Sequence, residues 1–490
     1  MSSHDTAAAA SAAVPDTAAA VGSAEPVGTA VQRLAAFAVG CRESLPAAVA
    51  ADVPGRILDI LGLALAASTE PGADAVPSVL RAVRRWGGIA ESTVVGTGER
   101  LPAPVAALVN GTMAHALDFD DTHLPSVLHP SASVVPAALA AAEATGADGD
   151  ALIAAVAAGI EICNRLGTAA YDAELRNSVF FERGLHATSI CGTIGSAAAA
   201  GLLYGLDAAG IASAMGIAAS MGAGLIEANR TGGTVKKVHC GWAAHGGVTA
   251  AVLAAEGMTG PPTVLEGRFG FFAAYTDGRF DAGALLDGLG TRWELLRTVY
   301  KPYPTNHFTH PGIDCALALR ERGLTADDVA SAELGVAAPV LRTIAEPAAE
   351  KARPASAYHA KFSGPYTVAA ALTGGGGLGV TLSDFAELRA DRLALAARIR
   401  CVADERATER FPTAFGAVLR VRTHGGELLE HRVDSSRGGP EHPLRSEELA
   451  LKFAINATGA LTDAAAQALT ATVLGRRTAT EIMQACIADR

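Results

Sequence analysis

The sequence lacks clustered cysteines and any excess of positive charge. Its seven cysteines are scattered, and no two of them form a CxxC pair. This spacing argues against a disulfide framework, a zinc ribbon or an iron–sulfur motif, and it favours buried thiols in a reducing cytoplasm. The formal net charge is -11. Nucleic acid is therefore an unexpected partner, because phosphates require a basic face.

Long runs of leucine or phenylalanine are also missing, although hydrophobic residues make up 50% of the chain. Two uncharged runs, SICGTIGSAAAAGLLYGL and AAGIASAMGIAASMGAGLI, consist mainly of Ala, Gly and Ser. We interpret them as central helices of a soluble core and not as membrane spans. The N-terminal stretch has no basic region typical of a signal peptide, so residues 1–26 are predicted to be a disordered Ala-rich tail.

The remaining pattern predicts a mainly α fold, with a large discontinuous all-helical domain and a smaller inserted α+β lid domain. Apolar residues recur at spacings of three and four over residues 27–298, as in packed helices. Short β-like segments follow over residues 299–434, including a hairpin candidate, AVLRVRT-HGG-ELLEHRVD. Helical patterns resume over residues 435–490, with Ser446 as the expected N-cap. The simplest topology returns this segment to the first helical domain.

The stretch HALDFDDTH holds three carboxylates and two imidazoles within nine residues, between mostly apolar flanks. If it is helical, His115, Asp118 and Thr122 share one face, while Asp120 and His123 point elsewhere. Three interpretations compete. The stretch could be an acid/base site, a divalent-metal site without a recognised ligand spacing, or a hydrated polar helix end.

Other polar clusters allow similar alternatives. His186 in RGLHATSICGTIG is either a satisfied helix-end group or a proton-transfer group. Lys236 and His239 in RTGGTVKKVHCGWAAHGG suit anion capture or a solvated loop. KPYPTNHFTHPG places Lys301 and two histidines at the change between domains. AKFSGPYTVAAAL sets Tyr366 near the start of a helix.

These motifs occur in an order that strongly resembles the MmgE/PrpD family, which includes 2-methylcitrate dehydratase, cis-aconitate decarboxylase and iminodisuccinate epimerase. The resemblance rests on HALDFDDTH…HPSAS, RGLHATSICGTIGSAAAA, KKVHCGWAAHGG, KPYPTNHFTHPGIDCAL and AKFSGPYTVAAAL. It extends from about residue 27 to the C-terminus. It implies a helical domain built from both chain ends, an inserted α+β lid, a site between the two, a homodimer, and no metal or organic cofactor.

Carried over residue by residue, the decarboxylase branch of the family implies a pocket with two groups of side chains. The side chains implied to be catalytic are Asp118, Thr122, His129, His186 and Tyr366. Those implied to bind the carboxylates of the substrate are Lys236, Lys301 and His239. In this scheme the lysines neutralise charge, the catalytic histidines move a proton, and the tyrosine acts from the lid. No metal ligand is expected.

The expected function is that of a cofactor-independent lyase, a dehydratase or decarboxylase, acting on a small di- or tricarboxylic acid of the citrate or aconitate type. Dehydration is preferred over decarboxylation. Methylcitrate dehydratases tend to carry asparagine in place of Asp120 and to lack the KxxH element, which speaks against methylcitrate itself. The alternatives are an epimerase of a dicarboxylate such as iminodisuccinate, and a non-catalytic homologue. We expect a cytoplasmic homodimer that binds neither nucleic acid nor membranes.

Overall fold

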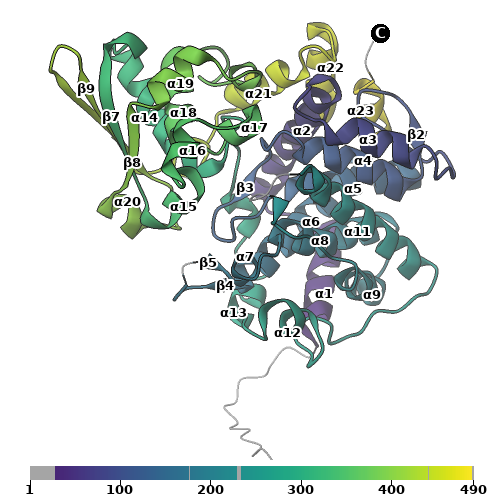
Figure 1. Ribbon diagram of the computed structural model, residues 1–490. Coiled ribbons are helices and arrows are strands. Elements are labelled where there is room, and N and C mark those ends of the chain that lie inside the picture. Colours follow the sequence, from purple (N-terminus) through teal and green to yellow (C-terminus); the bar gives the residue numbers. More distant parts are fainter. Residues whose placement is uncertain (1–27, 176, 229–232, 440, 488–490) are drawn as a thin grey trace, which may run out of the picture.

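The computed structural model describes residues 28–175, 177–228, 233–439 and 441–487, and it is mainly helical (Figure 1). The predicted fold class is therefore confirmed. The tail predicted at residues 1–26 lies outside the described residues. Figure 1 shows a helical part, which we call the body, beside a smaller part that carries a sheet, which we call the lid.

The body consists of helices from both ends of the chain. Its first set is α1 (Ala30–Glu43), α2 (Ala47–Thr69), α3 (Ala75–Val83), α4 (Ala103–His115), α5 (Ser131–Thr145), α6 (Gly149–Ala169), α7 (Val179–Glu182), α8 (Ala187–Leu203), α9 (Ala208–Ala219), α11 (His239–Ala255), α12 (Phe271–Thr276) and α13 (Ala282–Leu286). The C-terminal set is α21 (Ser446–Ala457), α22 (Asp463–Leu474) and α23 (Ala479–Ala485). In Figure 1, α21 and α22 lie near α2, with α21 next to the lid, whereas α23 lies farther from the lid, near α3.

The lid contains a four-stranded sheet in the order β10-β9-β7-β8, with β7 and β8 parallel and the other pairs antiparallel. Its strands are β7 (Val329–Val336), β8 (Ile399–Ala403), β9 (Ala417–Thr423) and β10 (Leu428–Val433). Its helices are α14 (His310–Glu321), α15 (Leu341–Ile344), α16 (Ala348–Ala352), α17 (Ala357–Ala360), α18 (Gly364–Thr373), α19 (Ala390–Ala396) and α20 (Glu405–Arg410). The β9–β10 hairpin confirms the predicted hairpin, because its turn spans Gly425-Gly426.

Short strand pairs and 3-10 helices connect these elements. The strands are β1 (Ser92–Thr93) with β2 (Arg100–Leu101), β3 (Thr122–His123) with β6 (Thr298–Val299), and β4 (Tyr171–Asp172) with β5 (Asn177–Ser178). The 3-10 helices are η1 (Val235–Val238), η2 (Glu294–Arg297), η3 (His307–Thr309), η4 (Ala326–Asp328), η5 (Ala338–Val340) and η6 (Leu382–Phe385). The β3–β6 pair matters most here, because it joins the segment after α4 to the segment that enters the lid.

Body and lid have separate hydrophobic cores. Phe453, Leu469 and Met483 from the C-terminal helices belong to the same core as the first body helices. The lid core joins α14, α18 and the sheet through residues such as Ile313 and Leu334. The chain thus leaves the body once and returns to it, while the exact residue boundaries of the domains stay a prediction.

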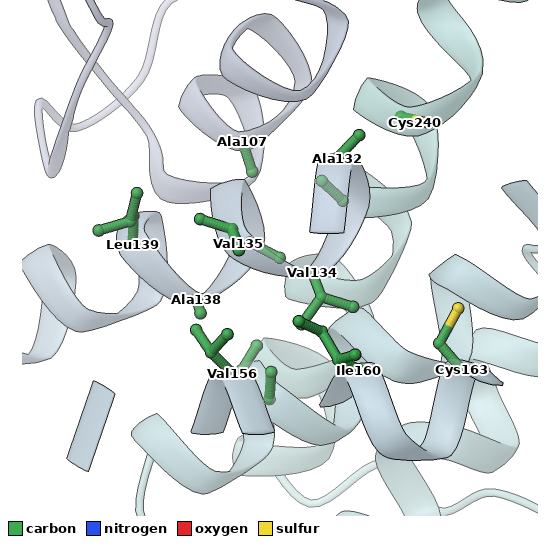
Figure 2. Close-up of a cluster of buried hydrophobic side chains, with 14 of the residues drawn as sticks. Ala107, Ala132, Val134, Val135, Ala138, Leu139, Val156, Ile160, Cys163 and Cys240 are labelled. Atoms are coloured by element: carbon green, nitrogen blue, oxygen red, sulfur yellow. The ribbon is translucent and has the colours of Figure 1, made fainter. Parts of the chain in front are cut away.

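Small residues let the body helices approach closely. Figure 2 shows Val134, Val135 and Ala138 of α5 among side chains of α4 and α6. Every residue of α8 is buried, which agrees with the prediction that this uncharged run is a core helix. Within the described residues, α6 is the one helix long and apolar enough to span a membrane, and 89% of its apolar window is buried inside the protein.

A glycine pair sets the crossing of α4 and α11. A Cβ atom at Gly241 would lie 2.1 Å from the Leu108 carbonyl oxygen, and one at Gly111 would lie 2.8 Å from the Gly241 Cα. Two side chains at this point would force the helices apart. The close crossing therefore fixes the C-terminal end of α4 relative to the start of α11, and both ends carry histidines.

Candidate active site

The HALDFDDTH stretch forms a helix end, a loop and a short strand. Helix α4 ends at His115, residues 116–121 form a loop, and β3 follows at once. Asp118 has φ 57, in the left-handed region, so the helix cannot continue through it. The helical face considered above is therefore wrong for this stretch. We call residues 116–121 the 116–121 loop.

The β3–β6 pair brings Lys301 to Asp118. Thr122 pairs with Val299 across these two antiparallel strands, and Lys301 follows two residues later. The Lys301 ammonium donates to the Asp118 carbonyl oxygen over 2.9 Å and to its carboxylate oxygen Oδ1 over 3.2 Å. Two of its three N–H donors are thus committed to Asp118.

Lys236 approaches the same carboxylate from η1. Its Nζ lies 3.7 Å from Asp118 Oδ1 and 5.5 Å from the centre of the Phe362 ring, which belongs to the lid. Burial by itself would lower the pKa of Lys236, but the negative charge of Asp118 raises it above the ordinary value. Lys236 is therefore a charged side chain at the boundary of body and lid, less tightly paired than Lys301.

The structure places four imidazoles side by side. The ring of His115 lies 5.5 Å from that of His129 and 5.8 Å from that of His186. His186 in turn shares a hydrogen bond with His239, whose Nδ1 atoms are 2.8 Å apart. Helix α4, the segment before α5, the N-cap of α8 and the start of α11 each supply one ring.

Hydrogen bonds define the tautomers of two of these rings. Nδ1 of His129 lies 2.6 Å from the Asp121 carbonyl oxygen, which can only accept, so this nitrogen carries the hydrogen. Nδ1 of His115 donates in the same way to Asp120 Oδ2 over 2.8 Å. In their neutral forms both rings then have Nε2 as the basic nitrogen. The buried Nε2 of His115 has no hydrogen-bond partner among the described residues.

Burial determines the charge states of the histidines. It lowers the pKa of His129 and of His239 to about 4, and it lowers the pKa of His186 well below its ordinary value with the help of nearby positive charge. These three rings are therefore neutral at neutral pH. The two carboxylates behave differently. Burial alone would raise the pKa of each, but the lysines beside Asp118 and the imidazole beside Asp120 hold both values low.

Two of the remaining predicted residues lie in different surroundings. The Thr122 hydroxyl is buried 3.4 Å from His129 Nδ1, within the cluster. Tyr366 is fully buried in the lid core, where its hydroxyl donates to the Glu387 carbonyl over 3.4 Å and its ring lies 6.0 Å from that of Phe385. The contacts of Tyr366 thus belong to the lid, whereas the other predicted residues gather around the 116–121 loop.

The structure adds residues that the predicted set omitted. Asp120 was expected to point away, but the loop turns its carboxylate back onto His115. The lid contributes Tyr358, which lies beside Lys236 and whose pKa is raised by burial. The spacing of five between His115 and Asp120 gives a contact only when the helix stops at His115. The left-handed φ of Asp118, which is incompatible with a continuing helix, is the feature that the sequence pattern did not reveal.

Three described side chains could in principle hold a metal ion. Ligand atoms of His115, Asp120 and Cys240 all lie within 4.8 Å of one another. However, the histidine and the aspartate already bind each other, and burial raises the pKa of the Cys240 thiol well above its ordinary value. A metal would require the thiolate. The group fits an oriented acid/base pair better than a metal site.

Comparisons with known proteins agree with this geometry. The model of the MmgE/PrpD N-terminal domain matches residues 32–282, and that of the MmgE/PrpD C-terminal domain matches residues 303–476. The cis-aconitate decarboxylase of Homo sapiens is 33% identical over 384 residues, which is 75% of each chain. That of Mus musculus is 30% identical over 413 residues, covering 82% of this chain and 81% of its own. The cis-aconitate decarboxylase of Aspergillus terreus is 31% identical over 241 residues, covering 47% of this chain and 48% of its own. The chain belongs to the MmgE/PrpD family.

Proposed function

We propose that this protein is a cofactor-independent lyase that removes carbon dioxide from a small tricarboxylic acid of the aconitate type. A cluster of buried imidazoles next to lysines that contact the 116–121 loop supports this proposal. The curated relatives reported above are named as cis-aconitate decarboxylases, which are lyases. Their names favour decarboxylation over the dehydration that the sequence pattern first suggested.

Decarboxylation requires two contributions from the protein. The bond between a carbon atom and its carboxylate breaks, carbon dioxide leaves, the electron pair stays on the carbon skeleton, and one proton takes the place of the carboxylate. The carboxylates that remain must be neutralised, and the proton must be delivered at the right carbon. Both requirements can be met by the side chains around the 116–121 loop.

We assign charge neutralisation mainly to Lys236. Its ammonium is 3.7 Å from Asp118 and is less committed to hydrogen bonds than that of Lys301, which already donates twice. A substrate carboxylate would therefore approach Lys236, with Lys301 holding Asp118 in place. His239 stands behind His186 and would fix its ring through their shared hydrogen.

We assign proton transfer to the imidazoles. His129 and His115 both have Nε2 as the basic nitrogen, so either ring can deliver the proton that replaces the carboxylate once Nε2 has taken one up. Thr122 and Asp120 would orient these two rings. The structure favours no particular lid group as a further donor, because Tyr366 is engaged within the lid while Tyr358 lies beside Lys236.

A direct assay tests the proposal. Purified protein treated with EDTA is incubated with cis-aconitate, citrate and 2-methylcitrate, while carbon dioxide release and alkene absorbance are followed. We expect carbon dioxide from cis-aconitate. A His129→Gln variant should lose this activity, whereas His424→Gln, which changes an exposed lid histidine, should keep it. Inertness toward all three acids would rule the proposal out.

An epimerase is the second candidate. Removal and return of a proton on opposite faces of one carbon needs two bases, and the rings of His129 and His186 both lie near that of His115, at 5.5 and 5.8 Å. Exchange of deuterium into an amino- or iminodicarboxylate without release of carbon dioxide would single this activity out.

A homodimeric assembly and a cytoplasmic location stay predictions.

A further inference from the structure

The carbonyl oxygens of three consecutive residues in the 116–121 loop each accept a hydrogen bond from a different lysine. Lys361 donates to the Leu117 carbonyl over 2.9 Å. Lys301 donates to that of Asp118 over 2.9 Å, and Lys452 to that of Phe119 over 3.1 Å. We call these side chains the lysine tripod, and all three are buried.

The tripod draws on three distant parts of the chain. Lys361 follows α17 in the lid, Lys301 follows β6 at the junction, and Lys452 lies in α21, which returns to the body. The whole sequence holds only six lysines. A chain that otherwise uses arginine for its positive charge thus places half of its lysines on three adjacent carbonyls.

The three ammonium groups differ in how their charge is balanced. Lys452 forms an ion pair with Asp59 over 2.7 Å, and Lys301 does so with the Asp118 carboxylate over 3.2 Å. No ion pair within 4 Å is found for Lys361 among the described residues, and burial lowers its pKa to about 8. Burying an ammonium without a directly paired carboxylate is unfavourable, and the hydrogen bond to the loop and the nearby negative charge of Asp118 offset part of that cost.

The tripod acts on the backbone that directs Asp118 and Asp120. Asp118 adopts φ 57, a conformation that non-glycine residues rarely hold without outside support. Its side chain meets Lys301 and Lys236, while the Asp120 side chain turns back to His115. Donors fixed on carbonyls 117 to 119 determine the orientation of these peptide groups, and with it the directions of both carboxylates.

We propose that Lys361 is a positioning residue through which the lid orders the 116–121 loop. Asp118 and Asp120 then adopt their observed positions only when the lid is docked against the body. The inference rests on the proposed function for its effect on turnover, but its structural part stands independently. Lys361 is the one tripod member supplied from within the lid, and its loss leaves the Leu117 carbonyl without this donor. Lys452 and Lys301 hold the same loop from the body and the junction.

The test compares Lys361→Met, Lys361→Arg and Lys351→Met. Lys351 is a matched control, because it also lies in the lid and donates to two backbone carbonyls, those of Thr343 and Phe362. Hydrogen–deuterium exchange of peptides covering residues 113–123 reports loop order. Steady-state kinetics with cis-aconitate report kcat and KM separately.

For Lys361→Met we expect faster exchange in the loop peptides and a fall in kcat of about 100-fold with little change in KM, because reacting groups are misplaced and no substrate contact is lost. Lys361→Arg, which keeps a charged donor, should recover part of both. Unchanged loop exchange in Lys361→Met, or the same changes in Lys351→Met, would overturn the inference. If the protein decarboxylates none of the acids, the proposed function fails while the exchange data still decide this inference.

Discussion

Asp120 and Lys236 show how single side chains set the chemistry of this site. Asp120 accepts the Nδ1 hydrogen of His115 and thereby leaves Nε2 of that ring as the basic atom. Lys236 keeps its charge although it is buried, because Asp118 lies 3.7 Å away. In both cases a carboxylate prepares a neighbouring group, and neither effect requires the carboxylate to react.

Removing the acceptor at Asp120 tests the first effect. We expect Asp120→Ala to lower kcat on cis-aconitate by about 100-fold or more, within the range of general acid–base catalysis. Asp120→Asn should lose less, since its amide oxygen can still accept the Nδ1 hydrogen. Carbon dioxide release measures the rates, and Asp327→Ala on the exposed surface of the lid is the control. Equal activity of the two Asp120 variants and the native protein would mean that this carboxylate does not orient His115.

Lys236→Met tests the second effect. Loss of a charge-assisted contact of about 1.5–3 kcal/mol should raise KM for cis-aconitate roughly 10- to 100-fold, with a smaller rise for a dianionic analogue. Arg400→Met removes an exposed positive charge and should leave KM unchanged. If KM rises equally for substrates of different charge, Lys236 does not bind a carboxylate.

At the scale of elements, the position of the site depends on where helices and strands end and cross. Helix α4 stops at His115, α11 starts at His239, and the β3–β6 pair holds the loop between them against Lys301. The α4–α11 crossing is possible only because Gly111 and Gly241 face each other. Packing of small residues thus fixes the distance between two histidine-bearing helix ends.

Gly241→Ala should disturb this crossing. The added Cβ would lie 2.1 Å from the Leu108 carbonyl oxygen, so the helices must separate, at a cost of about 1–3 kcal/mol or more in the free energy of unfolding. Chemical denaturation measures that energy. Gly40→Ala in the exposed face of α1 meets nothing within 4 Å and should stabilise the protein slightly. A Gly241→Ala variant as stable as the native protein would contradict the close crossing.

Predictions from sequence succeeded at this scale where the signal is local. The β9–β10 hairpin follows from strand alternation and two glycines, and a helix begins at Ser446 as expected. The predicted N-cap was wrong by one residue, because Arg445 occupies that position. The helical interpretation of HALDFDDTH failed because helix periodicity carries no information on Asp118, which has φ 57 and accepts a hydrogen bond from the distant Lys301.

The whole molecule joins a body made from both chain ends to a lid, and it buries a large number of ionisable groups. Within the body core, α21–α23 pack with the first helices, and Lys452 reaches the 116–121 loop from there. The lid reaches the same loop through Lys361. The site is therefore a product of the complete fold, and its buried histidines make the stability of the fold depend on pH.

Stability should fall as the pH drops from about 6.5 toward 4. Unfolded histidines bind a proton near 6.5, whereas His129 and His239 in the fold do so at about 4. In that window the unfolded state binds more protons, so the free energy of unfolding decreases with falling pH, by up to about 1.4 kcal/mol per pH unit for each such histidine. The other histidines whose pKa burial lowers well below the ordinary value are His186, His307 and His310.

Buried carboxyls oppose this trend, because burial also raises the pKa values of Asp59, Glu143, Glu161 and Asp314 above their ordinary values. Burial raises the pKa of Asp121 to about 6, so the folded state binds its proton first and gains a little stability between about pH 6 and 4. We expect the five histidines named above to outweigh these carboxyls between pH 7 and 5, because the ordinary pKa of histidine, about 6.5, lies within that window. Melting temperatures measured from pH 8 to pH 4 at constant ionic strength test the sum, and a flat profile between pH 7 and 5 would contradict the neutral, buried state of the imidazoles.

The sequence by itself determined the mainly helical class, the hairpin, the polar motifs and their resemblance to one family, because periodicity, turn residues and residue type are local properties. Tertiary structure alone decided that Asp120 turns to His115, that Tyr366 contacts the lid, and that three lysines hold one loop. Those contacts join residues up to 333 positions apart. These contacts form only when packing of the body and the lid brings the corresponding backbone segments together. No local sequence pattern can therefore predict them.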